Sequence, residues 1–246
     1  MTAPFSIKES FKTGWRLLRA HSGLVFAVVL TLLAVQVAQS VVDNVLKDEP
    51  IGFLAGIVLG VANAVLGVGA TVISLRLAEG KSAEYRDLIP LWGVFLRFML
   101  SGLLVVLIVC VPILVGGILA TVSLFALAGD SLNLLEGVAG ASIPMGAIIP
   151  AAIFAGVGLG VGVYMALRYS MVRYSIVDGA KVVESLRTSW RLTRGAMGRL
   201  ALFVLAVIGV NILGALLFMV GLLITLPLSM LALAHVYLKL RHRHAA

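Results

Sequence analysis

Residues 181–199, KVVESLRTSWRLTRGAMGR, form the longest polar interruption in an otherwise apolar chain. On a helix, one side of this stretch is apolar and consists of Val183, Leu186, Trp190 and Met197. Another side is basic and consists of Arg187, Arg191 and Arg194. The pattern is typical of an amphipathic helix that lies in the membrane surface, with its guanidinium groups among the lipid head groups. We therefore predict an interfacial helix over about residues 180–198.

The same pattern occurs near the N-terminus. Residues 7–23, IKESFKTGWRLLRAHSG, align with residues 182–198 at a shift of 175 positions, with eight identities in seventeen pairs. This stretch predicts a second interfacial helix, over about residues 6–22, with a basic side that includes Lys12, Arg16 and Arg19. The two copies suggest an internal repeat of an interfacial helix followed by a helical hairpin. A third unit, over residues 81–168, is suggested by layout alone.

The composition is that of a membrane protein. Of 246 residues, 61% are apolar and only 12% are charged, whereas a soluble domain carries about 25% charged residues. The apolar residues come in runs of roughly 20, the length with which a helix crosses the hydrocarbon layer. We predict an all-α integral membrane protein that forms a single membrane domain. Its six transmembrane helices are expected over about residues 24–42, 51–75, 98–122, 145–167, 200–219 and 222–240.

The basic residues predict how the chain is oriented. The N-terminus, residues 76–97, residues 168–199 and the C-terminal tail hold 18 of the 19 Lys and Arg residues, and Lys47 is the exception. Because positive charges favour the cytoplasmic side, we expect both termini in the cytoplasm. The net charge of +8 then reflects topology and contact with lipid rather than nucleic-acid binding. Trp15, Trp92 and Trp190 each lie in a cytoplasmic segment, as interfacial anchors do.

The two basic sides give a candidate binding site. We hypothesise that six residues bind anionic lipid head groups at the inner leaflet: Lys12, Arg16, Arg19, Arg187, Arg191 and Arg194. Arginine suits phosphate because its planar fork donates two parallel hydrogen bonds. The alternative is that these residues only fix the topology and anchor the helices.

Few polar residues lie within the predicted spans. Asn63 and Asn211 are candidates to line a cavity, although amides in spans more often hydrogen-bond a neighbouring helix. No Asp, Glu, Lys or Arg lies deep in a span, which argues against an ion-coupled transporter. We find no nucleophile paired with a base, no carboxylate pair in a span and no metal-ligand cluster. We therefore expect no catalytic residue, no metal and no cofactor.

Several stretches carry a resemblance to a known family. The chain resembles the membrane domain of the glycerophosphoryl diester phosphodiesterase membrane-domain family and related uncharacterised six-span bacterial membrane proteins. The resemblance lies in residues 6–18, 77–81, 177–178, 184–195 and 221–237. It implies a bacterial inner-membrane protein and transfers no catalytic residue. Since the chain ends at Ala246, we expect no phosphodiesterase domain.

These observations favour a non-enzymatic protein. Its expected role is that of an accessory or scaffold that engages anionic phospholipid at the cytoplasmic face. The alternative is a small transporter or flippase-like protein for a lipid or an amphipathic solute. The sequence leaves open whether the protein binds a protein partner or a second copy of itself.

Overall fold

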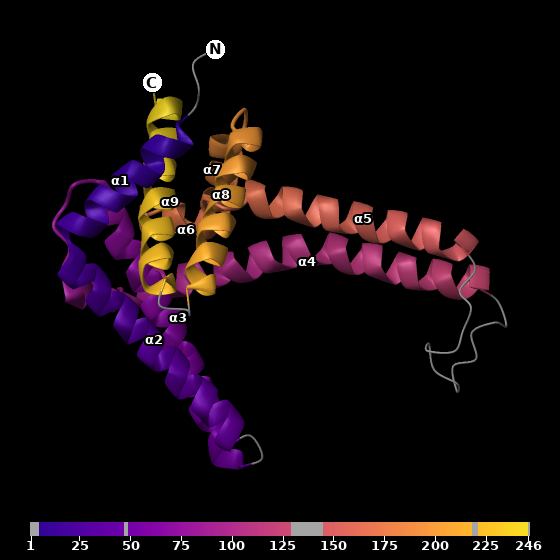
Figure 1. Cartoon of the computed structure of the whole chain (residues 1–246), viewed down its shortest axis with the longest axis horizontal. Coiled ribbons are helices and arrows are strands. Elements are labelled where there is room, and N and C mark those ends of the chain that lie inside the picture. The colour runs from indigo at the N-terminus through magenta and orange to yellow at the C-terminus, as the bar shows by residue number, and fades with distance from the viewer. Residues whose placement is uncertain (1–4, 47–48, 129–144, 218–220, 246) are drawn as a thin grey trace. The chain divides into compact units, whose positions relative to one another are not determined.

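The fold was obtained as a computed structural model, which describes residues 5–46, 49–128, 145–217 and 221–245 (Figure 1). Helices account for 88% of the structure, and the described residues contain no strand, which confirms the predicted all-α class. The connection between the third and fourth predicted spans lies largely outside the described residues, since residues 129–144 are not described. So do Lys47 and the predicted end of the fifth span at residue 219.

Six helices of the described chain are long and apolar enough to cross a membrane, as predicted. They are α2 (Ser22–Val45), α3 (Pro50–Ala78), α4 (Trp92–Ala128), α5 (Met145–Arg168), α8 (Met197–Leu216) and α9 (Leu222–Ala245). Most of them extend a few residues beyond the predicted spans. The clearest case is α4, which begins at Trp92, directly after Pro90 and Leu91 rather than at residue 98.

Four shorter helices accompany the spans: α1 (Ile7–Ala20), the 3₁₀ helix η1 (Tyr85–Leu88), α6 (Val172–Val177) and α7 (Val182–Thr193). Ser6 caps the N-terminus of α1, since its hydroxyl accepts a hydrogen bond from the Glu9 amide at 3.4 Å. In contrast, α7 ends five residues before the predicted boundary at residue 198. Gly195 adopts a left-handed backbone conformation with φ of +76°, which ends the helix and allows α8 to begin at Met197.

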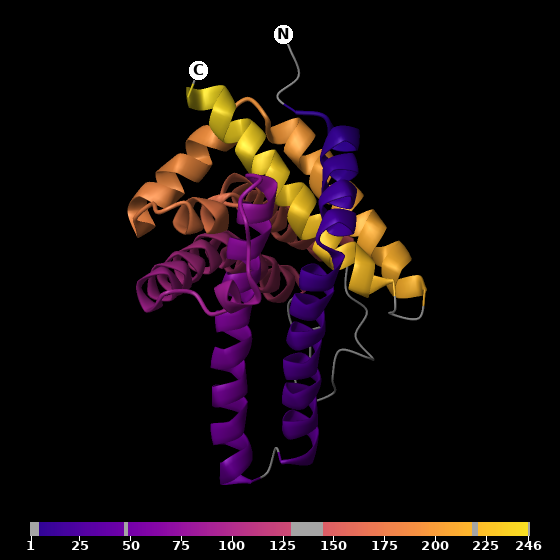
Figure 2. The ribbon, with the colours of Figure 1, turned by 90° about the vertical axis from the view of Figure 1, so that its left-hand side faces the viewer.

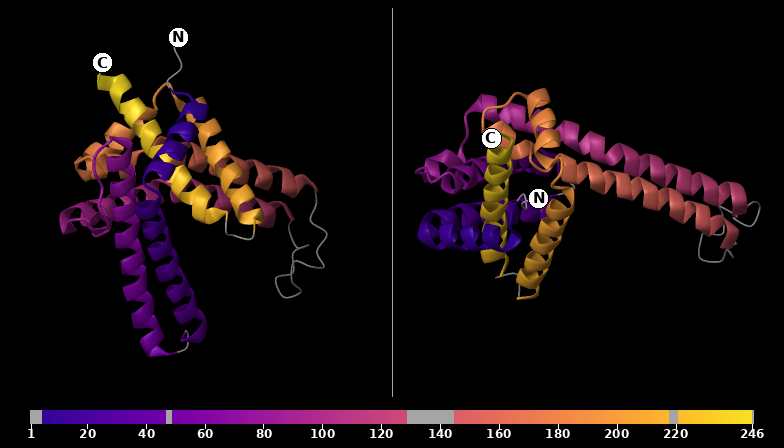
Figure 3. Two further views of the ribbon diagram at one scale, coloured as in Figure 1. Left: turned by 60° about the vertical axis from the view of Figure 1, so that its left-hand side comes forward. Right: turned by 90° about the horizontal axis from the view of Figure 1, so that it is seen from above.

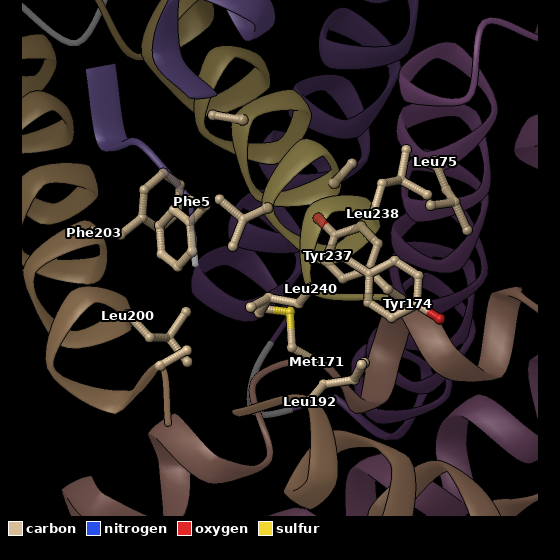
Figure 4. Packing of buried hydrophobic residues seen from close by; sticks show 14 residues of the cluster. Phe5, Leu75, Met171, Tyr174, Leu192, Leu200, Phe203, Tyr237, Leu238 and Leu240 are labelled. Carbon is tan, nitrogen blue, oxygen red and sulfur yellow. The ribbon is translucent and has the colours of Figure 1, made fainter. Parts of the chain in front are cut away.

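The described helices form two compact units. The first unit comprises Met1–Ser101 and Met171–Ala246. In it, α2 and α3 form an antiparallel hairpin, and α1 crosses α9 (Figure 2). Its main core gathers side chains from α3, α6, α7, α8 and α9, where the rings of Tyr174 and Tyr237 stack with centroids 5.6 Å apart (Figure 4).

The second unit, Gly102–Ser170, pairs most of α4 with α5 (Figure 3, right). Glycines set the distance between the two helices. A Cβ atom added to Gly158 would lie 2.6 Å from the Pro112 carbonyl oxygen and 2.8 Å from the Gly116 Cα atom. Gly158 and Gly162 contact α4, whereas a Cβ atom added to Gly156 or Gly160 would have no neighbouring atom within 4 Å. These contacts are the close helix packing that small residues permit.

Candidate functional site

Helix α1 lies with its backbone directly on α9. Its buried residues are Ser10, Gly14 and Leu18, which follow one another at intervals of four. A Cβ atom added to Gly14 would lie 3.1 Å from both the Ala232 nitrogen and the Leu228 carbonyl oxygen. The small residues Ser10 and Gly14 therefore let α1 approach the span closely, Leu18 is buried with them, and Trp15 is left 39% exposed.

The outer side of α1 forms a hollow of about 440 Å³. Its lining includes Lys12, Trp15, Arg16 and Arg19, and Glu9 is its acidic member. The Arg19 guanidinium lies 4.9 Å from the centroid of the Trp15 ring, within the range of a cation–π contact. The Glu9 carboxylate lies 3.4 Å from the Lys239 Nζ atom on α9, so a cation from outside the hollow offsets its charge.

Helix α7 packs differently from α1, although the two sequences are related. Its buried residues are Ser185, Ser189, Leu192 and Thr193. The Ser189 hydroxyl accepts a hydrogen bond from the Met171 amide at 3.2 Å, which ties α7 to the start of α6. A hollow of about 530 Å³ beside α7 includes Arg191, but Asp178 and Glu184 line it as well. Arg187 and Arg194 are exposed and line neither this hollow nor that of α1.

The structure also brings together an ionic cluster that sequence reasoning missed. The Arg241 guanidinium lies 2.7 Å from both carboxylate oxygens of Asp178 and donates to the Glu79 carboxylate at 3.0 Å. The Tyr237 hydroxyl donates to Asp178 at 2.8 Å, and the Lys81 Nζ atom lies 2.6 Å from Glu79. The cluster thus connects the C-terminal ends of α3, α6 and α9.

The environment of Glu79 favours its charged form. Burial alone raises the pKa of this carboxyl, but the hydrogen bonds and charges of Lys81 and Arg241 outweigh burial and lower the pKa below its usual value. At neutral pH, the cluster therefore contains an ionised Glu79.

No local pattern could have revealed this cluster, because Glu79, Asp178 and Arg241 are far apart in the sequence. Asp178 caps the C-terminus of α6, and Lys181 is the N-cap of α7. One signal was available, since the cluster joins three stretches that carry the family resemblance, residues 77–81, 177–178 and 221–237.

The two amides that were candidates for a cavity bond to neighbouring helices instead. The Asn63 side chain donates to the Gln36 side chain on α2 at 3.0 Å. The Asn211 side chain donates to the Ser229 hydroxyl on α9 at 3.2 Å. The three tryptophans are all exposed, with Trp92 at 70% the most accessible, as residues that contact the membrane interface would be.

Comparison with known proteins gives membership of a family but no activity. No curated protein matches the chain, and no solved structure matches it. Nothing in the comparisons ties it to the glycerophosphoryl diester phosphodiesterase membrane-domain family that the sequence resembles. A family model described as "Protein of unknown function (DUF975)" matches residues 15–244. With nearly the whole chain covered and six apolar helices in its described part, this multi-pass membrane protein belongs to that uncharacterised family.

Proposed function

We propose that the hollow on α1 binds the head group of an anionic phospholipid. In this proposal the protein is a non-enzymatic accessory or scaffold of a bacterial inner membrane, with both termini in the cytoplasm. The charge distribution supports the orientation, because the basic residues flank the same ends of the spans.

The observation that carries the proposal is the convergence of Lys12, Arg16 and Arg19 at one hollow. Residues that only set topology need to lie near the ends of spans, but they do not need to share a concave surface. Here, three cations face a volume of about 440 Å³, and Lys239 offsets the acidic Glu9. Two arginines supply donors that match phosphate oxygens. The ring of Trp15 lies beside them, and a tryptophan is favoured at the height of the head groups.

The copy on α7 supports the proposal by contrast. Its three arginines do not share a hollow, and the hollow that Arg191 lines is also lined by the acidic residues Asp178 and Glu184. An anionic head group at α7 would meet carboxylates as well as guanidinium groups. We therefore assign anionic lipid binding to α1 rather than to all six basic residues.

The transporter alternative receives less support. It requires Asn63 or Asn211 to face an opening, but both side chains bond to a neighbouring helix. Such bonds are what amides in spans ordinarily make.

The test compares two charge-matched variants of the purified protein in nanodiscs that contain phosphatidylglycerol and phosphatidylcholine. We expect K12Q/R16Q/R19Q to retain at least about tenfold less phosphatidylglycerol, because each basic residue near an anionic surface contributes about 1 kcal/mol before screening. R187Q/R191Q/R194Q removes the same charge from α7 and should lose much less. Native mass spectrometry of the released complexes measures the retained lipid. Equal retention by the α1 variant and the wild-type protein would refute the proposal.

A further inference from the structure

A hollow in the first unit lies between the C-terminal end of α3 and the N-terminal end of α4. It has a volume of about 850 Å³ and is bounded by the end of α3, the segment around η1, the first turn of α4 and the end of α6. Pockets of about 300–1,000 Å³ are those in which proteins hold small ligands. This hollow is separate from the proposed α1 site. The sequence analysis named none of the residues that line the hollow as a candidate site residue.

The charges that line this hollow are balanced. Its cations are Arg76, Lys81 and Arg86, and its anions are Glu79, Asp87 and Asp178. The charges are also already paired: Arg76 lies 2.6 Å from Asp87, Lys81 lies 2.6 Å from Glu79, and Arg86 lies 3.1 Å from Glu84. An anionic ligand would add an uncompensated negative charge to this set. A dipolar ligand could extend the pairs at both of its ends, with its anion at the cations and its cation at the carboxylates.

The wall of the hollow is apolar on the side of the spans. Val72 and Leu75 belong to the last turns of α3, and Val94 belongs to the first turns of α4. Beside them, Ile89 and Leu91 are exposed by 74% and 81%. Because α3 is an apolar helix long enough to span a membrane, a molecule that follows α3 from this hollow would continue from the charged end into hydrocarbon. The occupant should therefore carry an apolar chain beneath a charged head.

We propose that this hollow binds a zwitterionic phospholipid of the phosphatidylethanolamine type. Its phosphate would lie among Arg76, Lys81 and Arg86, its ammonium group would face the carboxylates of Glu79 and Asp87, and its acyl chains would follow Val72, Leu75 and Val94. The site on α1 and this hollow would then select lipids by charge. Cations outnumber anions at the α1 site, whereas the two are equal in number in this hollow. The proposal does not depend on whether α1 binds anionic lipid.

The first test fills the hollow. Ser82 lines it from an exposed position, so Ser82→Trp occupies space without disturbing a buried contact. Purified protein is placed in nanodiscs with equal amounts of phosphatidylethanolamine and phosphatidylglycerol, and native mass spectrometry counts the lipids that remain bound. We expect Ser82→Trp to lower retained phosphatidylethanolamine at least fivefold and to leave phosphatidylglycerol unchanged. Gly198→Trp is the control, because Gly198 is exposed and has no atom within 4 Å of an added Cβ atom.

The second test changes the charge balance. Glu79→Gln gives the lining a net positive charge, and one surplus charge should shift the ratio of retained phosphatidylglycerol to phosphatidylethanolamine about fivefold toward the anionic lipid. A role of Glu79 in folding alone would lower the retention of both lipids and leave their ratio unchanged. An unchanged ratio in the folded variant, or unchanged phosphatidylethanolamine in Ser82→Trp, would overturn the proposal.

A third arm separates the lipid from its soluble head group. Excess glycerophosphoethanolamine carries the same charges without acyl chains, so we expect it not to displace the bound lipid. Displacement by the soluble compound would overturn the assignment of the apolar wall to acyl chains. Failure of the α1 proposal is distinguishable, since K12Q/R16Q/R19Q should change phosphatidylglycerol alone.

Discussion

Helices α1 and α7 carry related sequences in different surroundings. Trp15 and Trp190 are equivalent in the alignment, and both are 39% exposed. The buried positions also correspond, since Ser10 and Gly14 of α1 align with Ser185 and Ser189 of α7. The repeat therefore preserves which side of the helix faces the protein and which side faces outward.

The buried side determines the partner of each helix. At the position where α1 has Gly14, α7 has Ser189. The glycine lets the α1 backbone approach the backbone of α9, whereas the serine hydroxyl accepts a hydrogen bond from the Met171 amide before α6. The difference between Gly14 and Ser189 thus accompanies a change from close backbone packing to a side-chain hydrogen bond. The exposed Trp and Arg residues are similar in the two helices. The residue in the middle of the buried side, Gly14 or Ser189, differs together with the element that each helix packs against.

The largest effect on stability is expected from a substitution of Gly14, where the backbones of α1 and α9 are close. We expect Gly14→Leu to lower the free energy of unfolding by about 3 kcal/mol, because overpacking at a tight contact typically costs 1–3 kcal/mol and a leucine cannot fit against the Ala232 backbone. Thermal unfolding in detergent, followed by circular dichroism, measures the effect. Gly23→Leu is the control, since an added Cβ atom there has no neighbour within 4 Å. Similar losses in both variants would show that α1 does not depend on the close approach.

A smaller effect is expected at the equivalent position of α7. Ser189→Ala leaves the Met171 amide without its acceptor inside the core, and a buried unsatisfied donor costs about 1–3 kcal/mol. Ser185→Ala is the matched variant. Its hydroxyl bonds the Val182 carbonyl within α7, so its removal should cost clearly less. Chemical denaturation of the two variants under the same conditions compares them, and equal losses would contradict the role of Ser189 as a tie.

The two helices also show how far the sequence alone could lead. The spans were predictable because each needs only a run of apolar residues, and the amphipathic pattern predicted helices close to the observed ranges of α1 and α7. The early end of α7 was not predicted, although Gly195 offers the conformation that ends a helix. The close approach of α1 to α9 was also not predicted, because it depends on the small residues Ser10 and Gly14, which are buried together with the apolar Leu18.

One candidate site was predictable from the sequence, and the other was not. Lys12, Arg16 and Arg19 lie within about two turns of one helix, so their convergence follows from helical periodicity. The cluster of Glu79, Asp178 and Arg241 requires three helix ends to meet, and 162 positions separate its first and last members. Long-range contacts of this kind depend on tertiary packing, which periodicity in one segment does not encode.

The smallest effects on stability are expected from two ionic contacts, the cluster that contains Glu79 and the Glu9–Lys239 pair beside α1. Because the folded-state pKa of Glu79 is lowered from 4.5, its ionised form stabilises the fold fully above that pH, and this contribution is lost as the pH falls through the lower folded value. We therefore expect wild-type protein to exceed Glu79→Gln in stability at pH 6 by about 1 kcal/mol or less, a gap that closes below pH 4.5. Glu9→Gln removes the pair with Lys239 beside α1, in which both side chains are about half exposed, and should leave almost no gap. Unfolding midpoints in denaturant from pH 6 to pH 3 measure both differences. A gap that widened on acidification would mean that the carboxyl of Glu79 is stabilised in its neutral form, and the ionic cluster would then not hold the ends of α3, α6 and α9 as its geometry indicates.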